Sequence, residues 1–574
     1  MKMNRLLSWL PLLACSFASA QLQYTVTPEP AAQSIRVRLE LEATSDMTEF
    51  RIPAWCPGYY VILEYQKKIS DIQVTDGSGV RLPTTPVDAR GWRINAPKGT
   101  KLILSYRVLG DDGGLGFFGV SVRPHTVFIN GPAAFMYPTD RLKEPVKLRF
   151  ELPEKWQVAT GMDSNAQGEY TSDGYDELLD HPVQLGLFER RTFVVQNIPF
   201  EAVYVSENQT FRANLDEETR QLKLLSEPAI KMMGGAPFKR YVYLIHLSIG
   251  DFSGGLEHRA STVIAIPNMT RLRIMELATH EFYHVWNIKH IRHRALGPFN
   301  YTQAVRTRSL WFSEGVTDYY AHLHAHQSGL RDAAGMIQLL SDQIEELQSA
   351  KSRLTHTIEE ASLAAWENGS FGVGDLSYYT KGSVAGLIFD AAIREASNDA
   401  RSLDDVMRTL FAKHRLPNPG FEEEDLLRAI NEAAGKDLST LYRKVIQSKE
   451  EVPLDHLAYL GLRVRMPGET ATALGFELNG AEVRQVDTDI AAQGLRRGDS
   501  VLLVQGKRFQ PGCFVPLKAQ AEYAVEVVRD GAHIKLNLRT KSVRTTRPTL
   551  EMDPFADAAA IQRRERWLAG TTPK

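Results

Sequence analysis

Apolar and polar residues alternate with a period of two along much of the chain up to about residue 205. The alternation is clearest at 34–41, 102–108 and 146–152, and turn-forming residues such as those at 76–79 separate the runs. A period of two places successive side chains on opposite faces of the backbone, as in a half-buried β-strand. The pattern therefore predicts a β-sandwich-like N-terminal domain at 21–205.

From residue 206 to residue 450 the pattern changes to that of helices, in which apolar residues recur every three or four positions. A strand-like run at 240–247 opens this part of the chain. The expected helices lie near 271–291, 308–328, 332–351, 377–397, 402–414 and 422–447. The pattern predicts one mostly helical domain at 206–450.

Short strand-like runs return at 451–545, and a polar tail with one helix-like segment follows at 546–574. The segment Leu474-Gly475-Phe476, followed by 494–507, resembles a PDZ domain. In such domains the Gly-Phe loop binds the C-terminal carboxylate of a peptide, and the edge of a strand receives the peptide as an added strand. The resemblance implies a PDZ-like β domain, for which peptide binding and a packing role are both open. The chain as a whole is expected to be a multidomain α+β protein.

Composition narrows the class of protein only slightly. The chain has 574 residues, of which 43% are hydrophobic and 24% are charged, as in ordinary globular domains. A formal net charge of −2 gives no reason to expect a nucleic-acid partner. No internal apolar run approaches the roughly 20 residues that span a bilayer, so we expect no transmembrane segment.

The N-terminus is typical of a secretory signal peptide at 1–20. Lys2 and Arg5 precede an apolar run, and an A-x-A cleavage site ends at Ala20. The alternative is a lipobox that ends at Cys15, which would make the protein lipid-anchored through that residue. Both interpretations predict an exported, periplasmic protein. Cleavage would leave Cys56 and Cys513 as the remaining thiols, which we expect to be free rather than bridged.

The motif HExxH at His280, Glu281 and His284 is the strongest chemical signal in the chain. Two histidines four residues apart lie on one face of a helix, where both can hold a single Zn²⁺. Glu281 lies beside them and can take a proton from a water molecule. Because HExxH alone is modest evidence, the other parts of a zinc peptidase decide the interpretation.

A third metal ligand is expected on a second helix. Glu314 lies in an aromatic segment that begins after the loop at 297–300, so two antiparallel helices can bring it opposite the two histidines. Asp318 lies one helical turn further on. There it can accept the free ring N–H of a ligand histidine, which fixes the tautomer of that histidine.

Two more segments can complete an exopeptidase site. Gly254 and Gly255 can align a substrate peptide through their backbone, and Glu257 can hold its free α-ammonium by charge-assisted hydrogen bonds. Further along, Tyr378 or Tyr379 opens a helix and can donate a phenolic hydrogen bond to the oxyanion of the tetrahedral intermediate.

Together these motifs resemble those of the glycyl aminopeptidase family of gluzincin zinc metallopeptidases. The resemblance implies a thermolysin-like catalytic domain with one Zn²⁺ held by His280, His284 and Glu314, and with Glu281 as the general base. It also matches Glu257 to the amine-binding glutamate of relatives and Tyr379 to their oxyanion tyrosine, with Tyr378 as the rival. The elements that carry the resemblance are Trp55–Tyr59, Gly254–His258, His280–Arg292, Trp311–Tyr320, Tyr378–Gly382 and the PDZ-like module.

The resemblance implies an exported aminopeptidase that releases small N-terminal residues, glycine or alanine, by means of a zinc-activated water. Its partners would be peptides with a free N-terminus. One alternative is a metalloendopeptidase in which Glu257 is structural, and another is a non-catalytic periplasmic peptide-binding protein that works through its PDZ-like domain. Two smaller questions stay open. His290 and His293 indicate a solvated basic turn rather than a second metal site, and the segment 53–59 indicates packing or a contact with the cleft.

Overall fold

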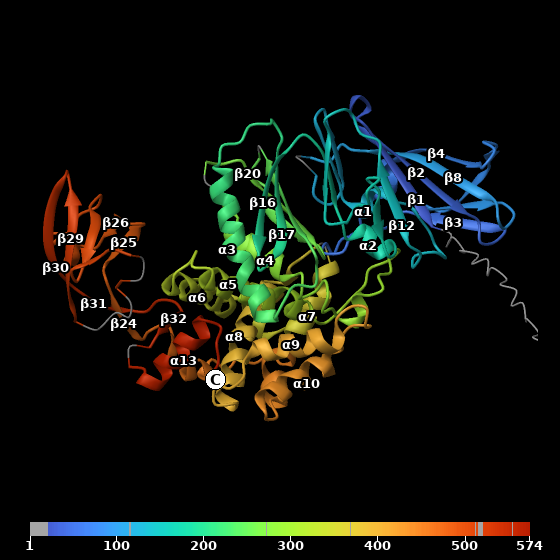
Figure 1. Cartoon of the computed structure of the whole chain (residues 1–574). Coiled ribbons are helices and arrows are strands. Elements are labelled where there is room, and N and C mark those ends of the chain that lie inside the picture. The colour runs from blue at the N-terminus through green and yellow to red at the C-terminus, as the bar shows by residue number, and fades with distance from the viewer. Residues whose placement is uncertain are drawn as a thin grey trace, which may run out of the picture.

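The computed structural model describes residues 21–573 except 114–115, 249, 271–272, 368, 511–512, 515–519 and 554. The expected signal peptide at 1–20, with Cys15, lies outside the described residues. The chain is a multidomain α/β protein with a β-rich N-terminal region, a helical middle region and a second β-rich part near the C-terminus (Figure 1). Among the described helices, none is long and apolar enough to cross a membrane.

The N-terminal region (residues 22–186) contains three sheets whose inward side chains share one apolar core. In the seven-stranded sheet the strands follow the order β14 (Tyr170–Ser172), β12 (Val146–Phe150), β1 (Leu22–Glu29), β2 (Ser34–Glu42), β8 (Lys101–Leu109), β4 (Ile69–Asp76) and β5 (Arg81–Leu82). One four-stranded sheet has the order β13 (Gln157–Thr160), β15 (Val183–Gly186), β10 (Thr126–Ile129) and β9 (Val120–Arg123). The other has the order β11 (Tyr137–Pro138), β3 (Met47–Arg51), β7 (Gly91–Asn95) and β6 (Thr84–Asp88). Two short helices, α1 (Gly131–Ala134) and α2 (Tyr175–Leu179), connect strands of this region.

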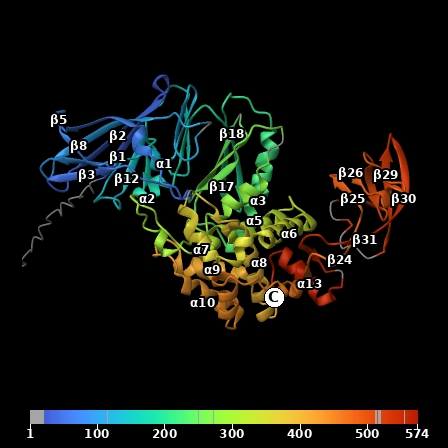
Figure 2. The same ribbon diagram turned by 180° about the vertical axis from the view of Figure 1, so that it is seen from behind.

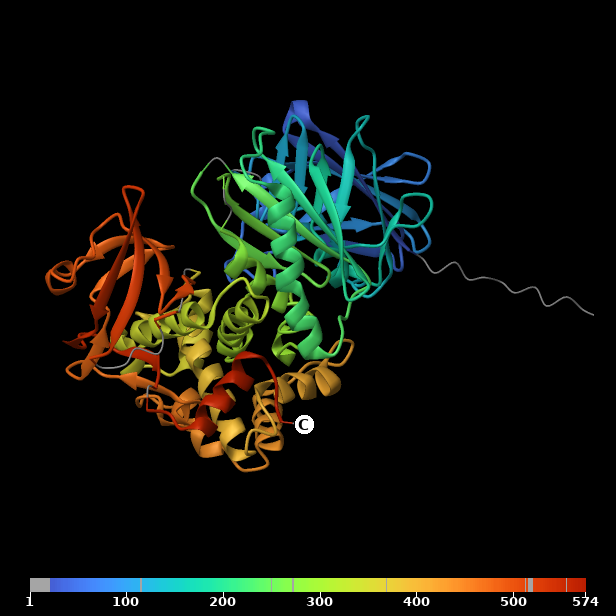
Figure 3. The same ribbon diagram turned by 60° about the vertical axis from the view of Figure 1, so that its left-hand side comes forward.

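A five-stranded sheet joins the N-terminal region to the helices. Its strands follow the order β16 (Glu189–Val195), β17 (Ile198–Ser206), β18 (Tyr241–Ser248), β20 (Ser261–Pro267) and β19 (Gly254–Glu257). All eight residues of β18 are buried, as expected for a central strand that is covered on both faces. One face packs against the helices and the other against Phe128 and Ala159 of the N-terminal region. The expected boundary at residue 205 therefore falls within this sheet, and Figure 3 shows the N-terminal strands behind it.

The middle region packs its helices around α8 (Tyr378–Ala396), which is buried along almost its whole length. The other helices are α3 (Leu215–Met233), α4 (Met275–Tyr283), α5 (Val316–Gln327), α6 (Ala333–Ser349), α7 (Ile358–Leu363), α9 (Leu403–His414), α10 (Glu423–Ala434) and α11 (Ser439–Tyr442). One expected helix, 422–447, is divided because Gly435 adopts a left-handed conformation with φ of 62° and ends α10.

The C-terminal β region (residues 462–552) is an excursion from the helical part. The pairs β23 (Leu462–Arg465) with β32 (Thr549–Met552) and β24 (Thr470–Ala473) with β31 (Lys541–Arg544) lead to a sheet with its own core. Its strands are β25 (Phe476–Asn479), β26 (Glu482–Val486), β27 (Ser500–Val504), β28 (Lys507–Arg508), β29 (Glu522–Arg529) and β30 (Ala532–Arg539), with helix α12 (Thr488–Ala491) after β26. Figures 1 and 2 show this sheet standing apart from the rest of the molecule.

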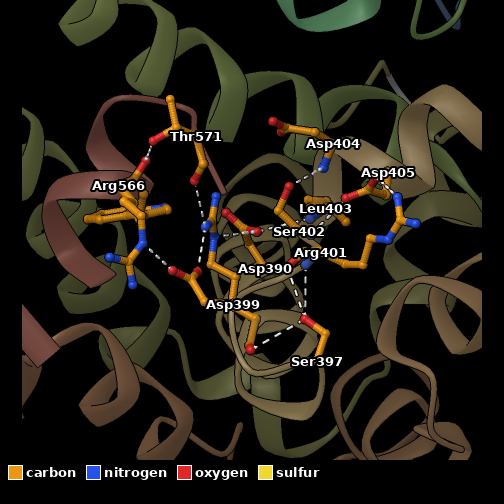
Figure 4. A network of polar contacts seen from close by, with 12 residues as sticks. Asp390, Ser397, Asp399, Arg401, Ser402, Leu403, Asp404, Asp405, Arg566 and Thr571 are labelled. Atoms are coloured by element: carbon orange, nitrogen blue, oxygen red, sulfur yellow. Dashed lines mark hydrogen bonds and ion pairs between the residues drawn. The ribbon is translucent and has the colours of Figure 1, made fainter. Parts of the chain in front are cut away.

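After β32 the chain returns to the helical part as α13 (Ala558–Leu568). Trp567 is fully buried there, and its indole N–H donates to the hydroxyl of Tyr319 over 2.8 Å. Arg566 pairs with Asp399, and Arg394 donates to the carbonyl of Thr571, as Figure 4 shows for the labelled partners. The last helix is therefore part of the core of the middle region.

Candidate active site

The two histidines of the HExxH motif face each other at the end of α4. The Nε2 atoms of His280 and His284 are 2.9 Å apart. The Nδ1 of His280 lies 2.7 Å from Asp318 Oδ1, and the Nδ1 of His284 lies 2.7 Å from the carbonyl oxygen of Asn287. Both acceptors require a proton on Nδ1, which turns each Nε2 toward the other ring. In their neutral forms the two rings can therefore bind one shared cation through their Nε2 atoms.

The structure brings Glu314 to the same point from a π-helical turn, η4 (Trp311–Gly315). Its Oε2 is 3.2 Å from His284 Nε2 and 3.5 Å from His280 Nε2. Burial alone would raise the pKa of Glu314, but the two histidines hold it well below its usual range. The carboxylate is therefore ionised, as a metal ligand must be. Two imidazole nitrogens and one carboxylate oxygen form the donor set of a catalytic zinc site, so the residues fit this metal.

Glu314 can reach the two histidines because the backbones of η4 and α8 lie very close together. A Cβ on Gly315 would collide with the backbone of Gly382 on α8, so both positions need glycine for η4 and α8 to meet. Asn287 fixes the other side, because its side-chain amide donates to the carbonyl of Phe312 over 2.8 Å while its own carbonyl accepts from His284. This turn also explains why α4 ends at Tyr283 rather than near 291 as expected.

Glu281 lies against β19 on the inner side of the histidine pair. Its Oε2 is buried and has no hydrogen-bond partner within the described residues. A Cβ on Gly255 would overlap the Glu281 carboxylate, so this glycine leaves room for it. Burial raises the pKa of Glu281 to about 7, and the neighbouring histidines only partly oppose this effect. A carboxylate with a pKa near neutrality can both take up and return a proton.

Strand β19 places Gly254, Gly255 and Glu257 along the same site. Among the described strands β19 pairs only with β20, so its outer edge carries backbone groups that can pair with an extended peptide. A carboxylate oxygen of Glu257 lies within 4.8 Å of ligand atoms of Glu281 and His284. The expected amine-binding carboxylate is therefore next to the expected base and metal ligands.

The two candidate tyrosines occupy the first turn of α8. The side chain of Ser377 caps this helix by accepting from the backbone N–H of Tyr379 over 3.1 Å. The ring centroid of Tyr379 is 6.0 Å from that of His280 and 5.0 Å from that of Tyr378. Burial and then Glu314 raise the pKa of both phenols. Both hydroxyls therefore stay protonated, and of the two rings it is Tyr379 that stacks on His280, an expected metal ligand.

Two residues of the N-terminal region that were not predicted as site residues, Gly58 and Tyr60, also lie at the site. A Cβ on Gly58 would lie 3.0 Å from Oε2 of Glu257, so its backbone forms a wall against that carboxylate. Tyr60 is buried, and after burial itself Glu314 is the largest influence that raises its pKa. The unusual segment 53–59 could have indicated these residues, since both packing and contact with the cleft were open for it. The segment does both, since the indole of Trp55 also donates to the carbonyl of Asn300 over 2.8 Å.

The turn that contains His290 and His293 is not the solvated basic turn that we expected. His293 is buried, and its Nδ1 accepts the backbone N–H of Ala295 over 3.1 Å. Its Nε2 therefore carries the proton and faces Glu423 at 3.1 Å and Glu422 at 3.4 Å. A ring that accepts at Nδ1 and carries its proton on Nε2 is neutral and does not present a lone pair to a metal ion, so the three residues form a polar contact.

The two described cysteines, Cys56 and Cys513, are free thiols. Cys56 is buried at the contact between the N-terminal region and the five-stranded sheet, and burial raises the pKa of its thiol to about 12. This cysteine is therefore an apolar packing residue.

Two family models match the chain. Residues 23–187 match the peptidase M61 N-terminal domain, and residues 273–385 match M61 glycyl aminopeptidase. Together these matches support a peptidase. The second match contains the HExxH motif, Glu314 and both candidate tyrosines, whereas β19 with Glu257 lies between the two matches.

A solved structure shares the fold of almost the whole chain. The crystal structure of an aminopeptidase N family protein from Idiomarina loihiensis superposes with a TM-score of 0.75 and 22% sequence identity. The alignment covers 96% of this chain and 100% of that chain. No curated protein matches the sequence.

Proposed function

We propose that this chain is a zinc-dependent aminopeptidase that releases small N-terminal residues from peptides. The observation that carries the proposal is the convergence of His280, His284 and Glu314, with Glu257 beside them. A metal triad supports hydrolysis of a peptide bond, and an adjacent buried carboxylate suits the free α-ammonium of a substrate. The preference for glycine or alanine rests on the M61 glycyl aminopeptidase match.

A zinc ion held by His280, His284 and Glu314 would polarise the scissile carbonyl and make a water molecule acidic. Glu281 takes the proton of the attacking water and returns it to the leaving amine, which its pKa of about 7 allows. Tyr379 donates its hydroxyl hydrogen to the developing oxyanion, with Tyr378 as the alternative donor. Asp318 holds the His280 ring in the tautomer that leaves Nε2 free.

Substrate alignment would come from β19. The backbone of Gly254 and Gly255 extends the sheet by pairing with the peptide, while Glu257 binds the α-ammonium at the end of the strand. Gly58 and Tyr60 line the same cavity as Glu257, and we infer that they limit the space beyond the first residue of the substrate.

The test compares glycyl, alanyl and leucyl anilides with N-acetylglycyl anilide. We expect hydrolysis of the unblocked glycyl and alanyl substrates, loss of activity after chelation and its return with one equivalent of zinc. Equal cleavage of the acetylated substrate would favour the metalloendopeptidase. Peptide binding without any hydrolysis in the zinc-loaded protein would favour the non-catalytic binding protein.

We also propose that the C-terminal β region is a PDZ-like module. Among the described strands β25 pairs only with β26, and it begins directly after Gly475, which has φ of 76°. A free strand edge that follows a Gly-Phe loop is the element that receives peptide C-termini in such domains. Fluorescence anisotropy with a library of C-terminal peptides tests this proposal, and equal affinity for amidated peptides would contradict it.

Export through the segment at 1–20 is likewise our proposal. Mass spectrometry of the mature N-terminus distinguishes its two forms, because simple cleavage leaves Gln21 first and lipidation leaves a modified Cys15.

A further inference from the structure

Lys289 is a buried cation at the contact between the N-terminal region and the proposed active site. Its Nζ lies 2.9 Å from Asp180 Oδ1 and 3.6 Å from Glu257 Oε1. Asp180 directly follows helix α2 of the N-terminal region, whereas Glu257 ends strand β19. One ammonium group therefore links the proposed amine-binding carboxylate to a different part of the molecule.

Glu257 needs such a partner. It is 7% exposed, and a carboxylate that is buried to this extent needs a polar or charged partner to hold it in place. The backbone of Gly58 covers the carboxylate and offers no side chain. Within the described residues, Lys289 is the one ion-pair partner of Glu257.

Lys289 can hold Glu257 without forming a close ion pair with it, because Asp180 is the nearer partner of the lysine. Lys289 lies closer to Asp180 than to Glu257, so most of its charge is balanced on the side away from the substrate. Asp180 is itself fixed by Arg259 at 3.2 Å and His258 at 3.3 Å. Burial lowers the pKa of Lys289, but Asp180 and Glu257 together more than offset this, so the lysine stays charged. At 3.6 Å from Lys289, the Glu257 carboxylate is held near the lysine without a close hydrogen bond to it, which leaves its oxygens open to a substrate ammonium.

We propose that Asp180 and Lys289 form a relay across the domain contact that positions Glu257 for the α-ammonium of the substrate. This inference rests on the proposed aminopeptidase function. Both are positioning residues, because their side chains act through Glu257, and the contact of Lys289 with His284 is made by its backbone N–H, which donates to the His284 carbonyl over 3.0 Å and which a side-chain substitution leaves in place. The N-terminal region would then be part of the machinery that selects free N-termini.

A matched pair of inhibitors isolates this contact. Glycine hydroxamate and acetohydroxamate carry the same metal-binding group, but only the first has an α-amine. The wild-type protein should bind glycine hydroxamate more tightly. Lys289→Met, which keeps the side-chain volume similar, should reduce that preference about tenfold, the effect of losing one charge-assisted hydrogen bond. The inhibition constant of acetohydroxamate and the zinc content should stay unchanged.

Arg240→Met is the matched control for domain docking. The Arg240 guanidinium donates to the carbonyls of Thr160 and Met162 across the same contact, and it pairs with Glu201 rather than Glu257. This variant should lower thermal stability and leave the ratio of the two inhibition constants unchanged. If Arg240→Met lowers the ratio as much as Lys289→Met, the effect is general docking and the relay is overturned.

The remaining outcomes separate the relay from the function on which it rests. Absence of a preference for glycine hydroxamate in the wild-type protein contradicts amine recognition and hence the proposed aminopeptidase. A wild-type preference that Lys289→Met retains contradicts the relay alone. Reduced preference in both Lys289→Met and Asp180→Asn, with Arg240→Met unaffected, supports it.

Discussion

Two β-rich parts flank the helices, and they are attached to them in opposite ways. The N-terminal region shares a core with the five-stranded sheet and sends Gly58, Tyr60 and Asp180 to the proposed active site. The C-terminal β region has a core of its own and is reached through paired entry and exit strands. The first is therefore integrated with the site, whereas the second is an insertion whose sheet has a separate core and whose outer strands, β23 and β32, pack on the helices.

The C-terminal β region is recognised as an insertion because the chain returns to the helical part after it, as α13. Trp567 on α13 is fully buried and donates to Tyr319, the neighbour in sequence of Asp318, which holds His280. Residues on both sides of the C-terminal β region thus complete one core. Proximity to the C-terminus alone would have grouped α13 with the inserted sheet, whereas its contacts group it with the helices.

Removal of the proposed general base, Glu281, should have the largest effect on activity of all the changes considered, and the effects of changes in the two β-rich parts can be compared with it. Glu281→Gln should lower kcat by about 10²–10⁴-fold, because a positioned general base contributes that much. The amide is nearly isosteric, so zinc content by atomic absorption should remain at one ion per chain. Wild-type turnover in this variant would show that another group takes the proton.

The substitution Asp180→Asn should weaken the contact between the N-terminal region and the rest of the protein and so lower the free energy of unfolding. This change leaves Lys289 and Arg259 without their shared carboxylate, and breaking a buried ion pair costs about 3–5 kcal/mol of the free energy of unfolding. Urea unfolding at pH 7, monitored by tryptophan fluorescence, measures the cost. A cost below about 1 kcal/mol, as for a surface pair, would show that the contact is not integral.

The pH dependence of that cost has a definite sign. Although burial alone would raise the pKa of Asp180, Lys289, a hydrogen bond from His258, and Arg259 hold it well below its ordinary value of 3.8. A depressed folded-state pKa adds stability above the unfolded-state value and loses it as the pH falls further. The difference between wild-type protein and Asp180→Asn should therefore be equal at pH 7 and pH 5.5 and should shrink below about pH 4.

How far the sequence predicts the site depends on sequence separation. His280 and His284 follow from local helix geometry alone, and Glu314 follows from a second motif whose helix the period of 3.6 indicates. Lys289 and Asp180 are 109 residues apart and belong to no periodic pattern, so only the tertiary structure reveals their contact. The early end of α4 is likewise accompanied by a contact between distant parts of the sequence, because the side chain of Asn287 donates to the carbonyl of Phe312.

The last helix should show a smaller effect than the N-terminal contact. Trp567→Phe keeps an aromatic ring in the core but removes the donor to Tyr319, which costs about 1–3 kcal/mol when a buried partner is left unsatisfied. The hydroxyl of Tyr319 still donates to Asp390 over 2.6 Å, which limits the loss. Differential scanning calorimetry of the two proteins checks this, and an unchanged melting temperature would place α13 outside the core.

The smallest effect should come from the largest deletion. β23 and β32 are antiparallel, and Arg465 lies opposite Thr549, so a two-residue Asn-Gly turn can replace residues 466–548 and close a hairpin. That hairpin keeps its anchor, because the backbone N–H of Leu550 still donates to Ser341 of α6 over 3.0 Å. Hydrolysis of glycyl anilide should then stay within about twofold of the wild-type kcat/KM, the range of changes remote from the site.

The control for this deletion is truncation after residue 552, which removes α13 and leaves the C-terminal β region in place. Its loss empties the pocket of Trp567, which costs about 3–5 kcal/mol for a large buried aromatic. We therefore expect the long deletion of residues 466–548 to preserve activity and the short truncation after residue 552 to destabilise the protein. Should the hairpin variant lose activity while the truncation keeps it, the inserted region must contact the substrate, and the contrast between the two β-rich parts would be wrong.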